Sequence, residues 1–220
     1  VRRVGCPVRA GLTAAPRDEA LAHVGLNPHM RTLLVVSGSL GADDVNAALR
    51  SLRGALEALS DRWQLLHVAG PGKAEAQRKA WTGSPLHRVA PEYCHRMDLA
   101  YAAADLVCWR AGASTIGELL AVGKPAVVLP YPYHRDLHQR YNAEALAASG
   151  AAEVVATEAG RPQRPADLAD ALLPAMRRPE RLAEMTRAAA EAGRADAADA
   201  IARYLLAAAR SAKGPLAPRA

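Results

Sequence analysis

The sequence predicts a single α/β domain built on a doubly wound parallel sheet. In the 220-residue chain, short apolar runs alternate with helical patterns of about ten residues, and turns rich in glycine or proline close most of the runs. Alternation of this kind implies right-handed crossovers and helices on both faces of the sheet. Half of the residues are hydrophobic, so the chain can bury the core that such a sheet needs.

Six apolar runs are the expected strands, because buried parallel strands are apolar throughout. They cover residues 33–36, 64–69, 86–90, 106–109, 126–129 and 152–155. Helical spacing predicts helices over 45–59, 97–104, 114–122 and 137–148, and a helical stretch from beyond Pro165 to Ala209. Asp43 or Asp44 can cap the first helix, and Ser114 can cap the third.

The chain divides into three parts. Residues 1–30, which several glycine and proline residues interrupt, are expected to form a linker, residues 31–210 the folded domain and residues 211–220 a flexible tail. No apolar run reaches the roughly 20 residues of a membrane span, and the N-terminal sequence lacks the apolar stretch of a signal peptide. Because the chain begins with Val1, we expect a fragment or a processed form of a longer protein.

Composition narrows the choice of partners. The net charge of +6 and the pI of about 9.5 suit binding to phosphate, nucleic acid or an anionic membrane surface. The alternative is that the charge reflects an Arg-rich genome, because the basic residues are scattered along the chain. Aromatic residues make up only 4% of the chain, so nucleic acid is not an expected partner. Cys6, Cys94 and Cys108 lack C-x-x-C spacing, which favours buried thiols in a reducing compartment over a zinc site.

Two loops at the carboxyl ends of expected strands are candidates for phosphate binding, since ligands bind at that edge of doubly wound sheets. The first, residues 37–42, is rich in glycine and lets the backbone approach a phosphate; a plain tight turn is the alternative. The second, residues 110–118, leads into a helix whose N-terminal amides suit a diphosphate, helped by the Ser114 and Thr115 hydroxyls. Glu118, one turn on, can accept two ribose hydroxyls; a capping arrangement is the alternative.

A third loop, residues 131–146, gathers polar side chains at the start of a helix, namely His134, Asp136, His138 and Gln139. They suit sugar hydroxyls, with Gln139 offering both a donor and an acceptor, and a solvated helix start is the alternative. No metal is expected, because no further ligand completes the histidine pair. The sequence contains no nucleophile elbow, Walker loop or metalloprotease motif, so no catalytic residue and no cofactor are assigned to this chain.

Together and in this order, the three loops resemble the donor-binding half of the MurG family, the bacterial transferases that use UDP-GlcNAc on the undecaprenyl-linked peptidoglycan precursor. The resemblance runs over residues 5–155 and rests on RAGAST followed by Glu118, GKPAVVLPYP, the pair His138-Gln139, and NAEAL from Asn142. It implies one half of a GT-B fold, a Rossmann-like domain with C-terminal helices, and makes residues 31–210 the UDP-sugar donor-binding domain. The acceptor domain of the family would precede this chain.

The resemblance also implies roles for individual residues. Arg9 corresponds to a donor-site arginine in the inter-domain linker, Ser39 to a serine near the diphosphate, and Cys94 to the position whose backbone reads the uracil. Gln139 corresponds to the glutamine that contacts the GlcNAc hydroxyls, and Gly38 and His138 are secondary candidates. The loop and helix start that hold the nucleotide, with Glu118 on the ribose, correspond to Ala113, Ser114, Thr115, Ile116, Gly117 and Glu118.

The sequence departs from the family pattern at three places. Cys6 stands where the family usually has Asn, and Leu40 replaces a common Gln, which removes a side-chain donor close to the phosphates. One extra residue, at or near Tyr133, precedes the His138-Gln139 pair.

The resemblance therefore implies an inverting hexosyltransferase that moves GlcNAc from UDP-GlcNAc to undecaprenyl-diphospho-MurNAc-pentapeptide, a step of cell wall biogenesis linked to cell shape and division. Expected partners are the UDP-GlcNAc donor, a lipid-linked acceptor held by the missing domain, and an anionic surface at the cytoplasmic side of the plasma membrane, where the enzyme is peripheral. Alone, this chain should be soluble and bind donor without turnover. Two alternatives stay open: the donor half of another GT-B transferase, and a non-catalytic nucleotide-sugar-binding domain.

Overall fold

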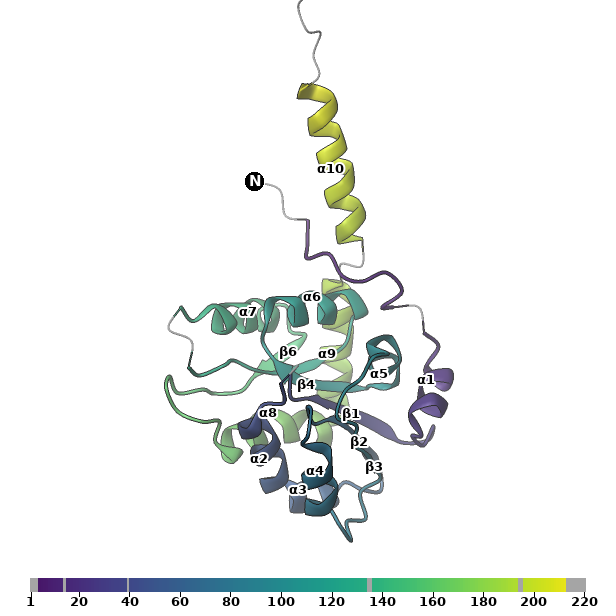
Figure 1. Ribbon diagram of the computed structural model, residues 1–220, viewed down its shortest axis with the longest axis vertical. Helices are drawn as coiled ribbons and strands as arrows, with labels where there is room; N and C mark the ends of the chain where they lie inside the picture. The colour runs from purple at the N-terminus through teal and green to yellow at the C-terminus, as the bar shows by residue number, and fades with distance from the viewer. Residues whose placement is uncertain (1–3, 14, 39, 134–135, 194–195, 213–220) are drawn as a thin grey trace, which may run out of the picture.

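The computed structural model describes residues 4–13, 15–38, 40–133, 136–193 and 196–212. Within these residues, six parallel strands form one sheet in the order β3-β2-β1-β4-β5-β6 (Figure 1). The strands are β1 (Arg31–Val36), β2 (Trp63–Val68), β3 (Arg88–Val89), β4 (Leu106–Arg110), β5 (Ala126–Leu129) and β6 (Ala152–Val154). The strand order reverses direction between β1 and β4, which is the switch point of a Rossmann-like sheet. The predicted doubly wound fold is confirmed.

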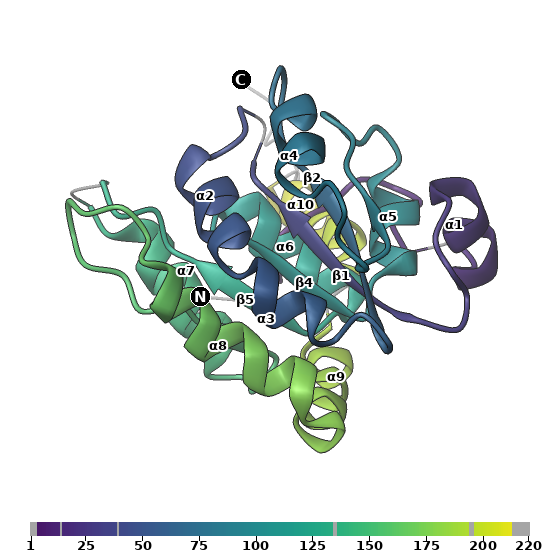
Figure 2. The ribbon, with the colours of Figure 1, turned by 90° about the horizontal axis from the view of Figure 1, so that it is seen from below.

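Helices cover both faces of the sheet. They are α1 (Arg17–Val24), α2 (Asp43–Ser51), α3 (Arg53–Glu57), α4 (Ala74–Ala80), α5 (Met97–Ala103), α6 (Ala113–Val122), α7 (His138–Ala147), α8 (Pro165–Arg177), α9 (Pro179–Ala192) and α10 (Ala197–Ala212). One face carries α6 and α7 and the other α2, α3, α4 and α8, while α10 extends away from the sheet (Figure 1). Helix α1 packs against α5 at one end of the domain (Figure 2).

The strands hold the two layers together because successive side chains point to opposite faces. In β1, Leu34 and Val36 belong to the core beneath α5, α6 and α7, whereas Leu33 and Val35 belong to the core beneath α2 and α8. Helix α9 contributes to both, with Ala189 in the first core and Met185 in the second. Every residue of β2 and β5 is buried, as expected of central strands in a parallel sheet.

Several helix predictions were wrong in detail. The helix expected over 45–59 is two helices, because Leu52 takes a ψ of 4° and tightens the turn between α2 and α3. Helices α1 and α4 lack an apolar stripe and were not predicted. The helical stretch beyond Pro165 is divided into α8, α9 and α10, and most of the expected tail, residues 213–220, lies outside the described residues.

A buried polar network fixes the loop after β1. His67 Nε2 and Ser37 Oγ lie 2.8 Å and 2.6 Å from Asn46 Oδ1, and Asn46 Nδ2 donates to the carbonyl of Ala69 at 3.0 Å. These bonds tie the ends of β1 and β2 to α2. Among the described residues, no helix combines the length and apolar character needed to span a bilayer.

Candidate functional site

A cavity of about 320 Å³ opens at the switch point of the sheet. Its floor is formed by strand-end residues, because Val36 of β1 is in register with Val68 of β2 and with Trp109 of β4. The complete lining is Arg9, Val36, Gly38, Val68, Tyr93, Cys94, Met97, Trp109, Ser114, Thr115 and Glu118. Six of the residues predicted from the sequence therefore meet at the edge where doubly wound sheets bind ligands.

Helix α6 begins at this cavity. It starts at Ala113 with Gly112 as its N-cap residue and without a side-chain cap, so the prediction that Ser114 caps the helix was wrong. The first intrahelical bond is donated by the Ile116 amide to Gly112, which leaves the amides before it available to a ligand. A helix N-terminus of this kind attracts phosphate through its amides and its dipole.

Residues 113–118, which were predicted together as site residues, lie in different environments. Ser114, Thr115 and Glu118 line the cavity, whereas the side chain of Ile116 is buried in the core. Gly117 is crossed closely by the N-terminal segment: a Cβ atom at this position would lie 2.8 Å from both Cβ and Sγ of Cys6. Glycine at 117 therefore lets residues 4–9 cross α6 and bring Arg9 to the cavity.

The Glu118 carboxylate is held from two sides. Tyr101 donates its hydroxyl proton to Oε2 at 2.8 Å, and Arg9 Nη2 lies 3.8 Å from Oε1. Burial and the neighbouring Glu118 carboxylate raise the pKa of Tyr101 far above its ordinary value, so the hydroxyl keeps the proton that it donates. The carboxylate is thus an anchored acceptor at the wall of the cavity.

The Gly-rich loop and the segment after β3 complete the cavity. Gly38 lines it with a φ of +79°, a conformation that favours glycine. Ser39 lies outside the described residues. Cys94 is half-buried, and burial raises the pKa of its thiol, so the group is neutral at ordinary pH.

The third loop is organised at the neighbouring strand, beyond the lining of this cavity. Gln139 Oε1 accepts the backbone N–H of Tyr131 at 3.0 Å, while His138 Nδ1 lies 2.6 Å from Asp136 Oδ1. His134 lies outside the described residues. Because β5 is adjacent to β4, Gln139 and His138 nevertheless lie at the same edge of the sheet as the cavity.

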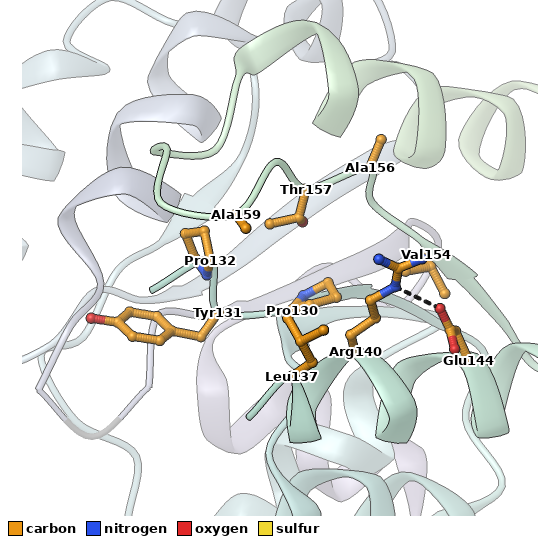
Figure 3. A pocket seen from close by; sticks show the side chains of 10 residues that line it. All are labelled: Pro130, Tyr131, Pro132, Leu137, Arg140, Glu144, Val154, Ala156, Thr157 and Ala159. Carbon is orange, nitrogen blue, oxygen red and sulfur yellow. Dashed lines mark hydrogen bonds and ion pairs between the residues drawn. The ribbon is translucent and has the colours of Figure 1, made fainter. Parts of the chain in front are cut away.

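A second cavity, of about 410 Å³, lies beside β5 and β6 (Figure 3). Its lining is mainly apolar, and its two charged residues, Arg140 and Glu144, pair with each other at 2.8 Å. The cation is therefore already neutralised, and the donor set for a diphosphate is weaker than at the start of α6. Among the described residues, no group of three His, Cys, Asp or Glu side chains is placed to hold a metal.

Besides the apolar lining residues Val36, Val68 and Met97, three aromatic residues of the candidate site were not predicted from the sequence: Tyr93 and Trp109, which line the cavity, and Tyr101, which lies behind Glu118. Trp109 could have been found, since it ends an expected strand at the ligand-binding edge. No local pattern indicates Tyr101, because its contact with Glu118 depends on how α5 packs beside α6.

The doubly wound sheet and the cavity at its switch point define a Rossmann-like ligand-binding domain. Residues 32–201 match the glycosyltransferase family 28 C-terminal domain, and the chain belongs to this family.

Two relatives are named UDP-N-acetylglucosamine–N-acetylmuramyl-(pentapeptide) pyrophosphoryl-undecaprenol N-acetylglucosamine transferase. The protein of Saccharopolyspora erythraea is 41% identical over 210 residues, which cover 93% of this chain and 53% of the relative. The protein of Mycobacterium tuberculosis is 43% identical over 213 residues, which cover 95% of this chain and 50% of the relative. The chain therefore spans about half the length of the curated relatives it matches.

Solved structures agree with this assignment. The crystal structure of Acinetobacter baumannii MurG matches with a TM-score of 0.70 and 29% identity, covering 86% of this chain and 52% of that one. WaaG, a glycosyltransferase involved in lipopolysaccharide biosynthesis, matches with a TM-score of 0.58 and 20% identity over 88% of this chain and 51% of that one, which shows a shared fold alone. The predicted half of a GT-B fold and the resemblance to the MurG family are confirmed.

Proposed function

We propose that this chain is the donor-binding half of an inverting transferase that moves GlcNAc from UDP-GlcNAc to undecaprenyl-diphospho-MurNAc-pentapeptide in peptidoglycan synthesis. The observation that carries the proposal is the cavity at the switch point, where a helix N-terminus, a cation and an anchored carboxylate face the same space. The names of relatives that match more than nine-tenths of the chain support the choice of donor and acceptor.

Each part of the nucleotide has a chemical counterpart at this cavity. The first-turn amides of α6 and the hydroxyls of Ser114 and Thr115 suit the diphosphate, and Gly38 lines the cavity at the loop after β1. The resemblance to the family adds Ser39 as a further contact of the diphosphate. The Glu118 carboxylate suits the ribose hydroxyls, since an ionised carboxylate only accepts hydrogen bonds. The backbone at Cys94 would read the uracil.

The sugar would lie toward the start of α7. Gln139 already uses its carbonyl oxygen to hold the Tyr131 amide, so its NH2 group is the part that can donate to a GlcNAc hydroxyl. His138 is next to it and is oriented by Asp136. The sugar would then be held between the loops that follow β4 and β5.

The chemistry that this half supplies is stabilisation of the leaving group. When an acceptor hydroxyl attacks the anomeric carbon, the bond to UDP breaks, the configuration inverts and the diphosphate oxygen leaves with the bonding electrons. Arg9 and the α6 amides would offset the charge that develops there, without a metal ion. The base that accepts the hydroxyl proton would come from the acceptor-binding half.

The proposed acceptor is a lipid, so we expect the complete enzyme to work at the cytoplasmic face of the plasma membrane. Attachment would be peripheral and would depend mainly on the acceptor-binding domain. The net charge of +6 on this half would add attraction to anionic lipids.

Calorimetric titration of this chain with UDP-GlcNAc, UDP-glucose and UDP tests the proposal. Glu118→Ala should weaken the binding of all three by about ten- to a hundredfold, which corresponds to about 1.5–3 kcal/mol for hydrogen bonds to a charged group. Gln139→Ala should weaken the two sugar nucleotides and leave UDP unchanged. Glu144→Ala, which removes a carboxylate beside the second cavity, is the matched control and should change nothing. Failure of the wild-type chain to bind any of the three ligands would refute the proposal.

A further inference from the structure

We infer that Tyr101 is a positioning residue for ribose recognition: its hydroxyl fixes the Glu118 carboxylate so that one oxygen is kept for the ribose of the nucleotide. The inference rests on the proposed function. It assigns a role to a side chain that lies behind the nucleotide cavity.

Tyr101 reaches the ligand only through Glu118. Its hydroxyl donates to Oε2 at 2.8 Å, and the residue is 1% exposed. It does not line the 320 Å³ cavity but a smaller one of about 250 Å³ beneath the N-terminal segment, together with Arg17, Asp98 and Lys124. A bound nucleotide would therefore touch Glu118 and leave Tyr101 untouched.

The tyrosine contact is the stronger of the two that hold Glu118. Arg9 lies 3.8 Å from Oε1 and its side chain is 61% exposed, so this ion pair is long and solvated. The Tyr101 ring, in contrast, is fixed by the core and by the Trp109 ring, whose centroid is 6.1 Å away. A rigid, neutral donor thus defines the orientation of the carboxylate before any ligand arrives.

Such anchoring matters because a free glutamate side chain has several rotatable bonds. Ordering them at the moment of binding would weaken the affinity, and a side chain that is already ordered avoids this loss. With Oε2 occupied by Tyr101, Oε1 is the acceptor that stays directed toward Arg9 and the cavity. The contribution of Tyr101 should therefore depend on the ribose hydroxyls of the ligand.

The test compares UDP with 2′,3′-dideoxy-UDP, which lacks both ribose hydroxyls, by calorimetric titration of the wild-type chain and Tyr101→Phe. For UDP, the variant should bind about five- to tenfold more weakly, in the range of the cost of ordering one side chain on binding, because the Glu118 carboxylate itself is still present. For dideoxy-UDP, the two proteins should bind within a factor of about two, because Glu118 then has no hydroxyl to hold. Tyr204→Phe, which removes a hydroxyl from the exposed face of α10, is the matched control and should equal the wild type with both ligands.

Equal weakening of both ligands by Tyr101→Phe would show a merely structural role and overturn the inference, and so would unchanged binding of UDP. Absence of UDP binding to the wild-type chain would instead refute the proposed function. Should Tyr101→Phe not fold, Tyr101→Met replaces it, since it also removes the hydroxyl and keeps an adaptable apolar side chain in the core; its loss of affinity should again be confined to UDP.

Discussion

At the scale of single residues, the largely buried ion pair between Arg110 and Asp44 organises the loops around the site. The Nη2–Oδ2 distance is 2.5 Å, and the two side chains are 10% and 18% exposed. Arg110 also donates to the carbonyl of Pro130 at 3.2 Å and lies over the ring of Tyr131. One guanidinium therefore joins the end of β4 to the start of α2 and to the loop after β5.

Replacing Asp44 by Ala should lower the free energy of unfolding by about 3 kcal/mol, because it leaves the Arg110 guanidinium buried without its carboxylate. Asp43 is the matched control, since it lies in the same first turn of α2 and pairs with Lys73, but its side chain is 83% exposed. Asp43→Ala should therefore cost less than about 1 kcal/mol. Urea unfolding of both variants measures the difference, and equal losses would contradict the account of Arg110.

At the scale of elements, His67 connects β2 to α2 inside the domain. Burial, reinforced by the charges of Arg88 and Arg50, lowers the pKa of His67 to about 3. Since the unfolded chain has a histidine pKa of about 6.5, the unfolded state takes up a proton first as the pH falls. The contribution of His67 to stability is therefore complete above about pH 6.5 and is lost progressively toward pH 3.

His67→Gln should flatten this pH dependence while keeping a donor for Asn46. Between pH 6 and pH 4, the free energy of unfolding of the wild type should fall more steeply than that of the variant by up to about 1.4 kcal/mol per pH unit. His87→Gln is the control, because His87 is exposed and should leave the wild-type slope unchanged. Urea unfolding at several pH values provides the measurement, and parallel slopes for wild type and His67→Gln would contradict the assignment.

The parts of the fold that were predicted from the sequence are those whose residues interact locally. Apolar runs such as Leu33–Val36 indicated the strands, and the small residues before Glu118 indicated the start of α6, because strand burial and helix starts leave local patterns. Helix α4 was missed because only Ala74 and Gln77 are buried, which produces no apolar stripe. The cap was wrongly assigned to Ser114 because several neighbouring residues are compatible with a helix start.

The sequence predicted many of the residues that belong to the candidate site, but it did not predict how they are arranged in space. Ser114, Thr115 and Glu118 meet at one cavity, as the pattern suggested. Ile116 and Gly117 could not be separated from them, since only packing shows that one side chain enters the core and that Cys6 crosses the other. The contact of Tyr101 with Glu118 joins residues 17 positions apart on different helices, so no local sequence pattern predicts it.

At the scale of the whole molecule, the chain spans about half the length of the curated relatives it matches, and the proposed transferase needs two substrates. The cavity at the switch point offers groups for a nucleotide, while the acceptor and the base are assigned to the other half. We therefore expect the isolated chain to bind UDP-GlcNAc without transferring GlcNAc. An assay of transfer to the lipid-linked acceptor, with the full-length relative from Mycobacterium tuberculosis as a positive control, measures this directly, and turnover by the isolated chain would contradict the division of roles.

The most direct test of the central claim is a crystal structure of this chain with UDP-GlcNAc bound. The account predicts the diphosphate at the first-turn amides of α6, the ribose within hydrogen-bond distance of Glu118, and the sugar toward Gln139. Density for the nucleotide in the cavity beside β5 and β6, with the switch point empty, would contradict it.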